Sequence, residues 1–181
     1  MRLFIAIDLP DSVKDAVAGL RADLPGAIWV KRQAFHLTLR FLGDPISEDR
    51  VESITNALAT VRSAPFIFHL DGVGRFPAGN RRPARVLWVG VRASPALTAL
   101  HAGVERAVRD VGFPPDDHAF RPHITLARFR SPAPSSALDS FLARYSAFQS
   151  EPIRVAEFIL YSSALAPHGS LYTPLAKFRF E

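Results

Sequence analysis

The chain has 181 residues, of which 48% are hydrophobic and 22% are charged, a balance that excludes a disordered chain and fits one domain or two small, closely packed lobes. It contains no cysteine, which excludes disulfides, iron–sulfur clusters, thiolate zinc sites and a cysteine nucleophile. The formal net charge is +5, and because most of the basic residues are arginine, the excess permits an anionic partner such as a phosphate ester. Genomic base composition would explain the arginine content equally well.

The chain opens with a short apolar segment, RLFIAID, that predicts a buried strand over 2–8. Its apolar run is too short for a signal peptide or for a bilayer span, which needs about 20 residues. The apolar runs that follow are also short. We therefore expect a cytoplasmic protein with no membrane partner.

Helical and extended patterns alternate along the rest of the chain. Apolar residues at helical spacing, from an N-cap at Asp11 or Ser12 to a stop at Pro25-Gly26, predict the first helix. Ser47 and Ser94 are the expected N-caps of two further helices. The other expected elements are two strands within 27–44 (the second over 35–42), helices over 47–61, 94–112 and 135–147, and strands over 66–73, 85–91, 120–129, 153–165 and 170–180. This order of elements predicts an α+β or α/β sandwich.

Two of the expected strands carry the same short pattern, FHLTLRF in the first half of the chain and HITLARF in the second. Alternate side chains of a strand share a face, so His36, Thr38 and Arg40 should point the same way, with apolar residues behind them. His123 and Thr125 should do the same in the second strand. The repetition suggests an internal duplication.

If the two strands lie side by side, or face each other across a groove, they bring two imidazoles and two hydroxyls to one small volume. Two imidazoles with pKa values near 6.5 can remove a proton from an attacking oxygen and deliver another to a leaving oxygen near neutral pH. The hydroxyls can donate to the non-bridging oxygens of a phosphodiester. The pattern therefore favours metal-independent phosphodiester chemistry.

Simpler interpretations exist for single histidines. Either motif histidine alone would more often be hydrogen-bonded within its own strand. A metal site on His36 and His123 lacks a third candidate ligand at readable spacing, so we expect no metal and no cofactor. The remaining histidines are assigned no role: His69, His101, His118 and His168.

These residues resemble the RNA 2′,3′-cyclic phosphodiesterases, also called 2′-5′ RNA ligases, of the two-histidine (2H) phosphoesterase superfamily. The resemblance covers nearly the whole chain and includes RLFIAIDLP, FHLTLRFLGD, RVLWVGV, FRPHITLAR and EFILYSSAL. It implies an α+β fold with two pseudo-symmetric lobes, each an antiparallel-rich sheet with helices packed outside, around a central cleft. The lobes would form a single domain over 1–181, with an internal duplication of about 1–92 and 93–181.

The resemblance also implies roles for the four motif residues. His36 would be the proton donor and His123 the proton acceptor in the hydrolysis of an RNA 2′,3′-cyclic phosphate end to a 2′-phosphomonoester. Thr38 and Thr125 would hold the phosphate. The ligase activity in the alternative name would be the reverse type of reaction, which joins RNA ends through a 2′-5′ bond.

Further candidates for binding the substrate are arginines and one phenylalanine. Arg128 follows the second motif but, by strict alternation, lies on the opposite face unless the strand bulges. Arg40 lies on the motif face by the same rule. The arginine-rich loop over 74–85 suits a single-stranded RNA end, through backbone contacts and base stacking, although a solvated hairpin loop would look the same. Its candidate residues are Phe76, Arg81 and Arg82.

Three functions fit these residues. The first is hydrolysis of RNA 2′,3′-cyclic phosphate ends by a monomeric protein, with tRNA fragments among the candidate partners. The second is hydrolysis of a small cyclic nucleotide or an ADP-ribose cyclic phosphate. The third is a non-catalytic RNA-end-binding protein whose histidines only contact phosphate. Because the two motifs are near copies, the residues alone do not assign the acid and the base.

Overall fold

Two four-stranded sheets form the two lobes of the protein, which a computed structural model describes over residues 1–166 and 169–181. The first sheet has the order β10-β9-β1-β3, the second has the order β2-β7-β6-β5, and β4 pairs with β8 separately. All of these pairings are antiparallel. The strands are β1 (Arg2–Asp8), β2 (Ala27–Trp29), β3 (His36–Gly43), β4 (Phe66–Phe68), β5 (Leu70–Phe76), β6 (Val86–Val91), β7 (His123–Phe129), β8 (Ile153–Val155), β9 (Glu157–Ala166) and β10 (Gly169–Arg179).

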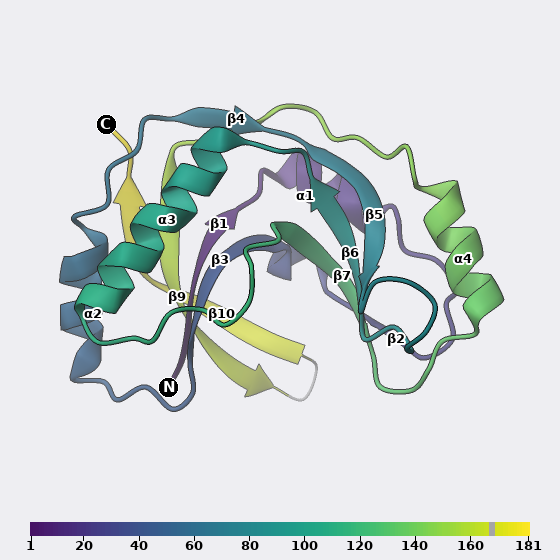
Figure 1. Ribbon diagram of the computed structural model, residues 1–181, viewed down its shortest axis with the longest axis horizontal. Coiled ribbons are helices and arrows are strands. Elements are labelled where there is room, and N and C mark those ends of the chain that lie inside the picture. Colours follow the sequence, from purple (N-terminus) through teal and green to yellow (C-terminus); the bar gives the residue numbers. More distant parts are fainter. Residues whose placement is uncertain (167–168) are drawn as a thin grey trace.

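Helices lie on the outer sides of the two sheets (Figure 1). α2 and α3 lie together on the side of β1 and β9, whereas α4 lies at the opposite end of the molecule, where the Phe141 ring is 5.9 Å from the ring of Trp29 in β2. The α+β fold with helices outside two antiparallel sheets is therefore confirmed. The helices are α1 (Asp11–Ala18), the 3-10 turn η1 (Arg32–Ala34), α2 (Arg50–Leu58), α3 (Pro95–Asp110) and α4 (Ser135–Arg144).

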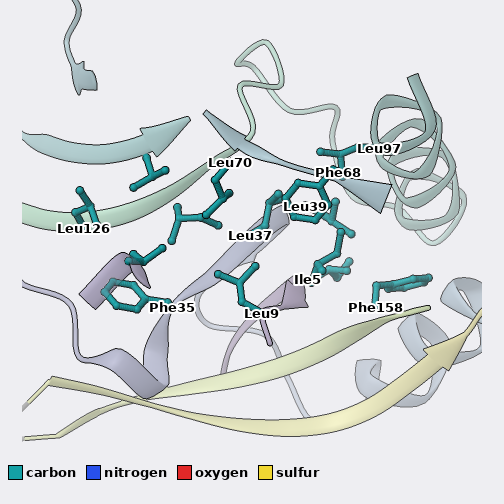
Figure 2. Packing of buried hydrophobic residues seen from close by; sticks show 14 of the residues in the cluster. Ile5, Leu9, Phe35, Leu37, Leu39, Phe68, Leu70, Leu97, Leu126 and Phe158 are labelled. Carbon is teal, nitrogen blue, oxygen red and sulfur yellow. The ribbon is translucent and has the colours of Figure 1, made fainter. Parts of the chain in front are cut away.

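A continuous apolar core lies between sheets and helices, and both motif strands contribute to it (Figure 2). Leu37 and Leu39 of β3 and Leu126 of β7 are at most 3% exposed. Burying such a side chain contributes about 1.5–3 kcal/mol. These apolar side chains anchor the strands from behind and so hold the intervening polar residues in fixed positions. None of the helices in the described part of the chain is long and apolar enough to cross a membrane.

Two of the expected N-caps are wrong. α1 begins after Pro10, which makes no side-chain cap, and ends at Ala18 because the next residue, a glycine, disfavours continuation of the helix. α2 begins after Asp49 rather than Ser47, because residues 47–50 form a turn in which the Ser47 carbonyl accepts the Arg50 N–H (3.2 Å). The third cap is confirmed: the Ser94 hydroxyl accepts the Leu97 N–H at the start of α3 (3.2 Å).

The strand expected over 66–73 is two strands that serve different sheets. β4 pairs with β8, whereas β5 pairs with β6, and His69 lies between them. A single extended run in the sequence therefore crosses from one part of the fold to another. The expected loop over 74–84 is also shorter, since β5 continues to Phe76.

Each sheet takes strands from both halves of the sequence. The first sheet joins β1 and β3 to β9 and β10, and the second sheet inserts β7 between β2 and β6. The lobes therefore do not coincide with residues 1–92 and 93–181, because the chain crosses between them several times. A duplication of the two halves stays a prediction.

Candidate active site

A bulge in β3 changes the face on which Arg40 lies. Ala6 of β1 pairs with Thr38 and Ile5 pairs with Arg40, so Leu39 is an extra residue. A bulge shifts the alternation of side chains by one position. Arg40 consequently leaves the face of the motif and is only 8% exposed, although it still borders the cavity. The prediction that it shares the face of the motif histidine is wrong.

The same bulge occurs in β7. Thr125 and Ala127 pair with consecutive residues of β6, so Leu126 is the extra residue. The shift brings Arg128 back to the face of His123, which strict alternation would not allow. Arg128 accordingly lines the same cavity as His123.

Phe41 and Arg128 occupy equivalent positions in the two lobes, each five residues after its motif histidine. Phe41 is 46% exposed and lines the cavity together with Arg128. The two near-identical motifs therefore place an aromatic ring on the cavity wall in one lobe and a cation in the other.

Both imidazoles are held in the same way by the backbone two residues before them. His36 Nδ1 lies 2.8 Å from the Ala34 carbonyl oxygen, and His123 Nδ1 lies 2.7 Å from the Arg121 carbonyl oxygen. A carbonyl only accepts hydrogen bonds, so each Nδ1 carries a proton and each Nε2 is the nitrogen free for proton transfer. The Thr38 hydroxyl lies 3.0 Å from His36 Nε2.

Aromatic rings fix the orientation of each imidazole further. Tyr172 of β10 meets His36 edge to face, with ring centroids 5.2 Å apart, and Phe76 of β5 meets His123 in the same way at 5.0 Å. The buried ring of Phe4 also lies against the rings of His36 and Tyr172, with its centroid 4.9 Å from that of His36 and 4.9 Å from that of Tyr172.

One cavity of about 720 Å³ contains the four motif residues. Tyr172 lies beside His36 and Phe76 lies beside His123, and the cavity is also lined by Phe41 and by several cations. The cations include Arg82, Arg85, Arg121 and Arg128. The cavity thus offers both aromatic rings, against which a base could stack, and cations that could bind phosphate.

Burial lowers the pKa of both motif histidines below the usual 6.5. For His36 the carboxylate of Asp8 opposes this effect, while a charged His123 would lower the pKa further. For His123 the guanidinium of Arg128 adds to the effect of burial. Both rings are largely neutral near pH 7 in the free protein.

The expected loop residues separate into two groups. Phe76 and Arg82 lie on the cavity wall, whereas Arg81 is exposed and outside it. Arg75 braces the loop from within: its Nε donates to the Pro77 carbonyl (3.0 Å), and its Nη2 donates to the carbonyl of Arg82. These hydrogen bonds hold the loop in place as one wall of the cavity.

The sequence prediction missed several residues of the cavity wall. Tyr172 comes from β10, whose approach to the first motif depends on long-range strand pairing. Phe41 was expected on the opposite face, because nothing in the sequence marks the bulge. Arg121 lies in the FRPHIT segment, but the first motif has no equivalent arginine, so the repeated pattern did not single it out.

The other histidines lie in different parts of the protein. His118 lines the cavity with an exposed ring, and His101 stacks on Phe120 with ring centroids 3.9 Å apart. His69 lies outside the cavity, and His168 lies outside the described residues. Within residues 1–166 and 169–181, no group of three or more histidines and carboxylates is placed to hold a metal ion.

Comparison with known proteins agrees with this geometry. The model of the 2′-5′ RNA ligase superfamily matches residues 9–166. The chain belongs to the 2′-5′ RNA ligase superfamily. An RNA 2′,3′-cyclic phosphodiesterase of Archaeoglobus fulgidus is 34% identical over 98% of this chain and 99% of its own, and one of Thermotoga maritima is 33% identical over 100% and 96%. The predicted family is confirmed.

Solved structures of the superfamily share the fold. A protein of Thermus thermophilus superposes with a TM-score of 0.81 at 30% identity, covering 99% of this chain and 98% of its own. Escherichia coli LigT complexed with 3′-AMP gives a TM-score of 0.75 at 28% identity, covering 99% and 97%. The bilobal arrangement is thus common to these superfamily members.

Proposed function

We propose that the protein is a metal-independent phosphodiesterase that hydrolyses RNA 2′,3′-cyclic phosphate ends to 2′-phosphomonoesters. The observation that carries the proposal is the pair of matched imidazoles in one cavity, each with Nδ1 held by a backbone carbonyl, so that Nε2 is the nitrogen available for proton transfer. Relatives covering nearly the whole chain are RNA 2′,3′-cyclic phosphodiesterases, which supports this substrate class.

The reaction needs one neutral and one protonated imidazole. His123 Nε2 removes a proton from water, and the water oxygen forms a bond to phosphorus. The bond from phosphorus to the 3′ oxygen breaks, and His36 Nε2–H delivers its proton to that oxygen. The product is a 2′-phosphomonoester with a free 3′-hydroxyl. The two rings exchange their protonation states, which solvent then restores.

The charge that develops on the phosphate is met by donors already in place. The hydroxyls of Thr38 and Thr125 donate to the non-bridging oxygens, and Arg128 adds a fixed positive charge on the same face as Thr125. Arg40 has no such role in this proposal, because its donors are engaged elsewhere.

The aromatic rings and the cations of the cavity support an orientation for the RNA. The terminal base stacks on Phe41 and Tyr172, and the preceding phosphates follow the cations, which include Arg82. A 5′-hydroxyl in place of water would form a 2′-5′ bond by the same transfers, so ligation would be a side reaction of the same site.

The decisive measurement is the incubation of the protein with an RNA oligomer that ends in a 2′,3′-cyclic phosphate, followed by identification of the product isomer. We expect a 2′-phosphate, formed equally well in the presence of a chelator. His36→Ala and His123→Ala should each lower turnover by at least about a hundredfold, while RNA binding survives. His69→Ala, outside the cavity, is the matched control and should keep the rate of the wild type.

A second pair of variants separates RNA from a small cyclic nucleotide as the substrate. Arg82→Gln should weaken binding of the RNA oligomer and flatten its salt dependence, while Arg81→Gln, one residue away but outside the cavity, should do so less. Equal rates for both histidine variants and the wild type would refute the proposed catalysis. Equal activity of Arg82→Gln and wild type on RNA would favour the small substrate.

A further inference from the structure

Arg40 is a buried cation that borders the cavity, but the proposed proton transfers do not use it. Its guanidinium meets three acceptors: Nη2 donates to the Pro114 carbonyl (2.6 Å), Nη1 lies 3.0 Å from Asp116 Oδ2, and Nε lies 2.6 Å from Glu105 Oε1. The contact with Glu105 is an ion pair whose angle is outside the range of a hydrogen bond. Two carboxylates and a carbonyl therefore share one cation.

Arg40 and its three acceptors belong to three different parts of the fold. Arg40 belongs to the first motif strand, Glu105 to α3, and Pro114 and Asp116 to residues 111–122, which we call the α3–β7 connection. This connection leads directly into the second motif strand. Arg40 thus links the strand of one motif histidine to the segment that precedes the other.

α3 holds the α3–β7 connection at a second point. The His101 ring lies parallel to that of Phe120, with centroids 3.9 Å apart and an interplanar angle of 7°. His101 and Glu105 are four residues apart and so share one face of α3. Burial lowers the pKa of His101, so its ring is neutral and stacks as an aromatic near pH 7.

The α3–β7 connection ends at the group that orients the second imidazole. The Arg121 carbonyl accepts the Nδ1–H of His123 (2.7 Å), and the neighbouring Asp116 and Phe120 line the cavity. Displacing this backbone would free the ring to rotate or to change its tautomer. A misplacement of about 1 Å caused far from the reacting atoms can cost about a hundredfold in rate.

We propose that Arg40 is a positioning residue for His123: it fixes the α3–β7 connection through Pro114 and Asp116, and the connection fixes the imidazole that accepts the proton. The effect on turnover rests on the proposed function, whereas the effect on the His123 ring does not.

Two variants test the proposal. Both are chosen so that a change in the protein cannot be explained only by a buried charge that has lost its partner. Arg40→Lys keeps the charge but replaces the planar fork by one nitrogen that cannot match three separated acceptors. Arg40→Met combined with Glu105→Gln removes the cation and one of its carboxylates together, because a single unpaired buried charge would strongly destabilise the fold.

Arg50→Met is the matched control. Arg50 also anchors the α3–β7 connection, since its Nη2 donates to the Val111 carbonyl (2.7 Å) and its guanidinium lies 4.3 Å from the Phe113 ring centre. It lies at the far end of the connection and outside the cavity. A general loss of stability would therefore affect the Arg50 and Arg40 variants alike.

The main readout is the imidazole ¹⁵N spectrum of the substrate-free protein, which distinguishes Nδ1–H from Nε2–H. We expect both Arg40 variants to shift His123 towards a mixture of tautomers while His36 keeps its own, and kcat to fall by about ten- to a hundredfold. Arg50→Met should lower Tm but leave the His123 signals and kcat as in the wild type.

Unchanged His123 signals and kcat in the folded Arg40 variants would overturn the proposal. So would an equal change of the His123 signals in Arg50→Met, since that result would mean general loosening. A wild-type protein inactive on cyclic-phosphate RNA would overturn the proposed function instead, and the tautomer spectra would still decide the role of Arg40.

Discussion

The charges near the two motif histidines differ, although the two motif sequences are nearly identical. Asp8 pairs with His36 across β1 and β3, and its carboxylate favours a proton on that ring, although Lys14 lies 2.7 Å from the same carboxylate and moderates the effect. Arg128 stands beside His123 and disfavours a proton there. Burial is the largest cause of the lowered pKa at both rings and acts against a proton on each, so the donor and acceptor roles stay part of the proposed function.

The pH dependence of the two kinetic parameters should differ. The proposed mechanism needs one neutral and one protonated imidazole, and burial lowers both pKa values below 6.5 in the free protein. The bell-shaped curve of kcat/KM should therefore have its maximum below about pH 6.5. The bound phosphate is an anion that raises both pKa values, so the maximum of kcat should lie at higher pH. Rate profiles between about pH 4.5 and 9 measure both, and a kcat maximum at lower pH than that of kcat/KM would contradict this account.

At the scale of single elements, the bulges in β3 and β7 shape the site. Each adds one residue after the motif threonine and thereby exchanges the faces of the residues that follow. Without the bulge, Arg128 would point away from the cavity and Arg40 would share the face of His36. With the bulge, Arg40 is available to hold the α3–β7 connection, so one local irregularity shapes both the cationic lining of the cavity and the brace behind it.

The helix that carries Glu105 and His101 begins with a side-chain cap, and its contribution can be measured. The Ser94 hydroxyl accepts the Leu97 N–H, so Ser94→Ala should lower the free energy of unfolding by about 1 kcal/mol. Ser47→Ala is the control, because the N-cap of α2 is Asp49 and Ser47 is exposed. Denaturant titration of both variants measures their free energies of unfolding. Equal losses of stability would mean that the cap of α3 contributes nothing specific.

At the scale of the whole molecule, the chain crosses repeatedly between two sheets so that β3 and β7 line one cavity. Placing imidazoles there requires burying them, and burial favours their neutral form. The burial of these imidazoles therefore affects the free energy of unfolding of the whole protein.

Stability should consequently depend on pH with a definite sign. Burial lowers the pKa of His36, His101 and His123 below 6.5, so the unfolded chain binds more protons and stability falls as the pH drops below about 6.5. Burial also raises the pKa of Tyr161 to about 12 from 10.0, so stability falls again as the pH rises above about 10. Thermal unfolding across this range should show a plateau between the two limits. Greater stability at about pH 5.5 than at about pH 7.5 would contradict this prediction, and His101→Gln should flatten the acidic side.

The sequence by itself determined the class of fold, most of the elements, and the four motif residues, because these depend on local periodicity and on a repeated pattern that chance seldom produces. The family followed from the same residues. The tertiary structure alone decided which side chains complete the site. Bulges come from pairing with a partner strand, so the faces of Arg40, Phe41 and Arg128 were not readable from β3 or β7 alone. Tyr172, Arg82 and the α3–β7 connection reach the cavity only through contacts between distant segments, which no local pattern records.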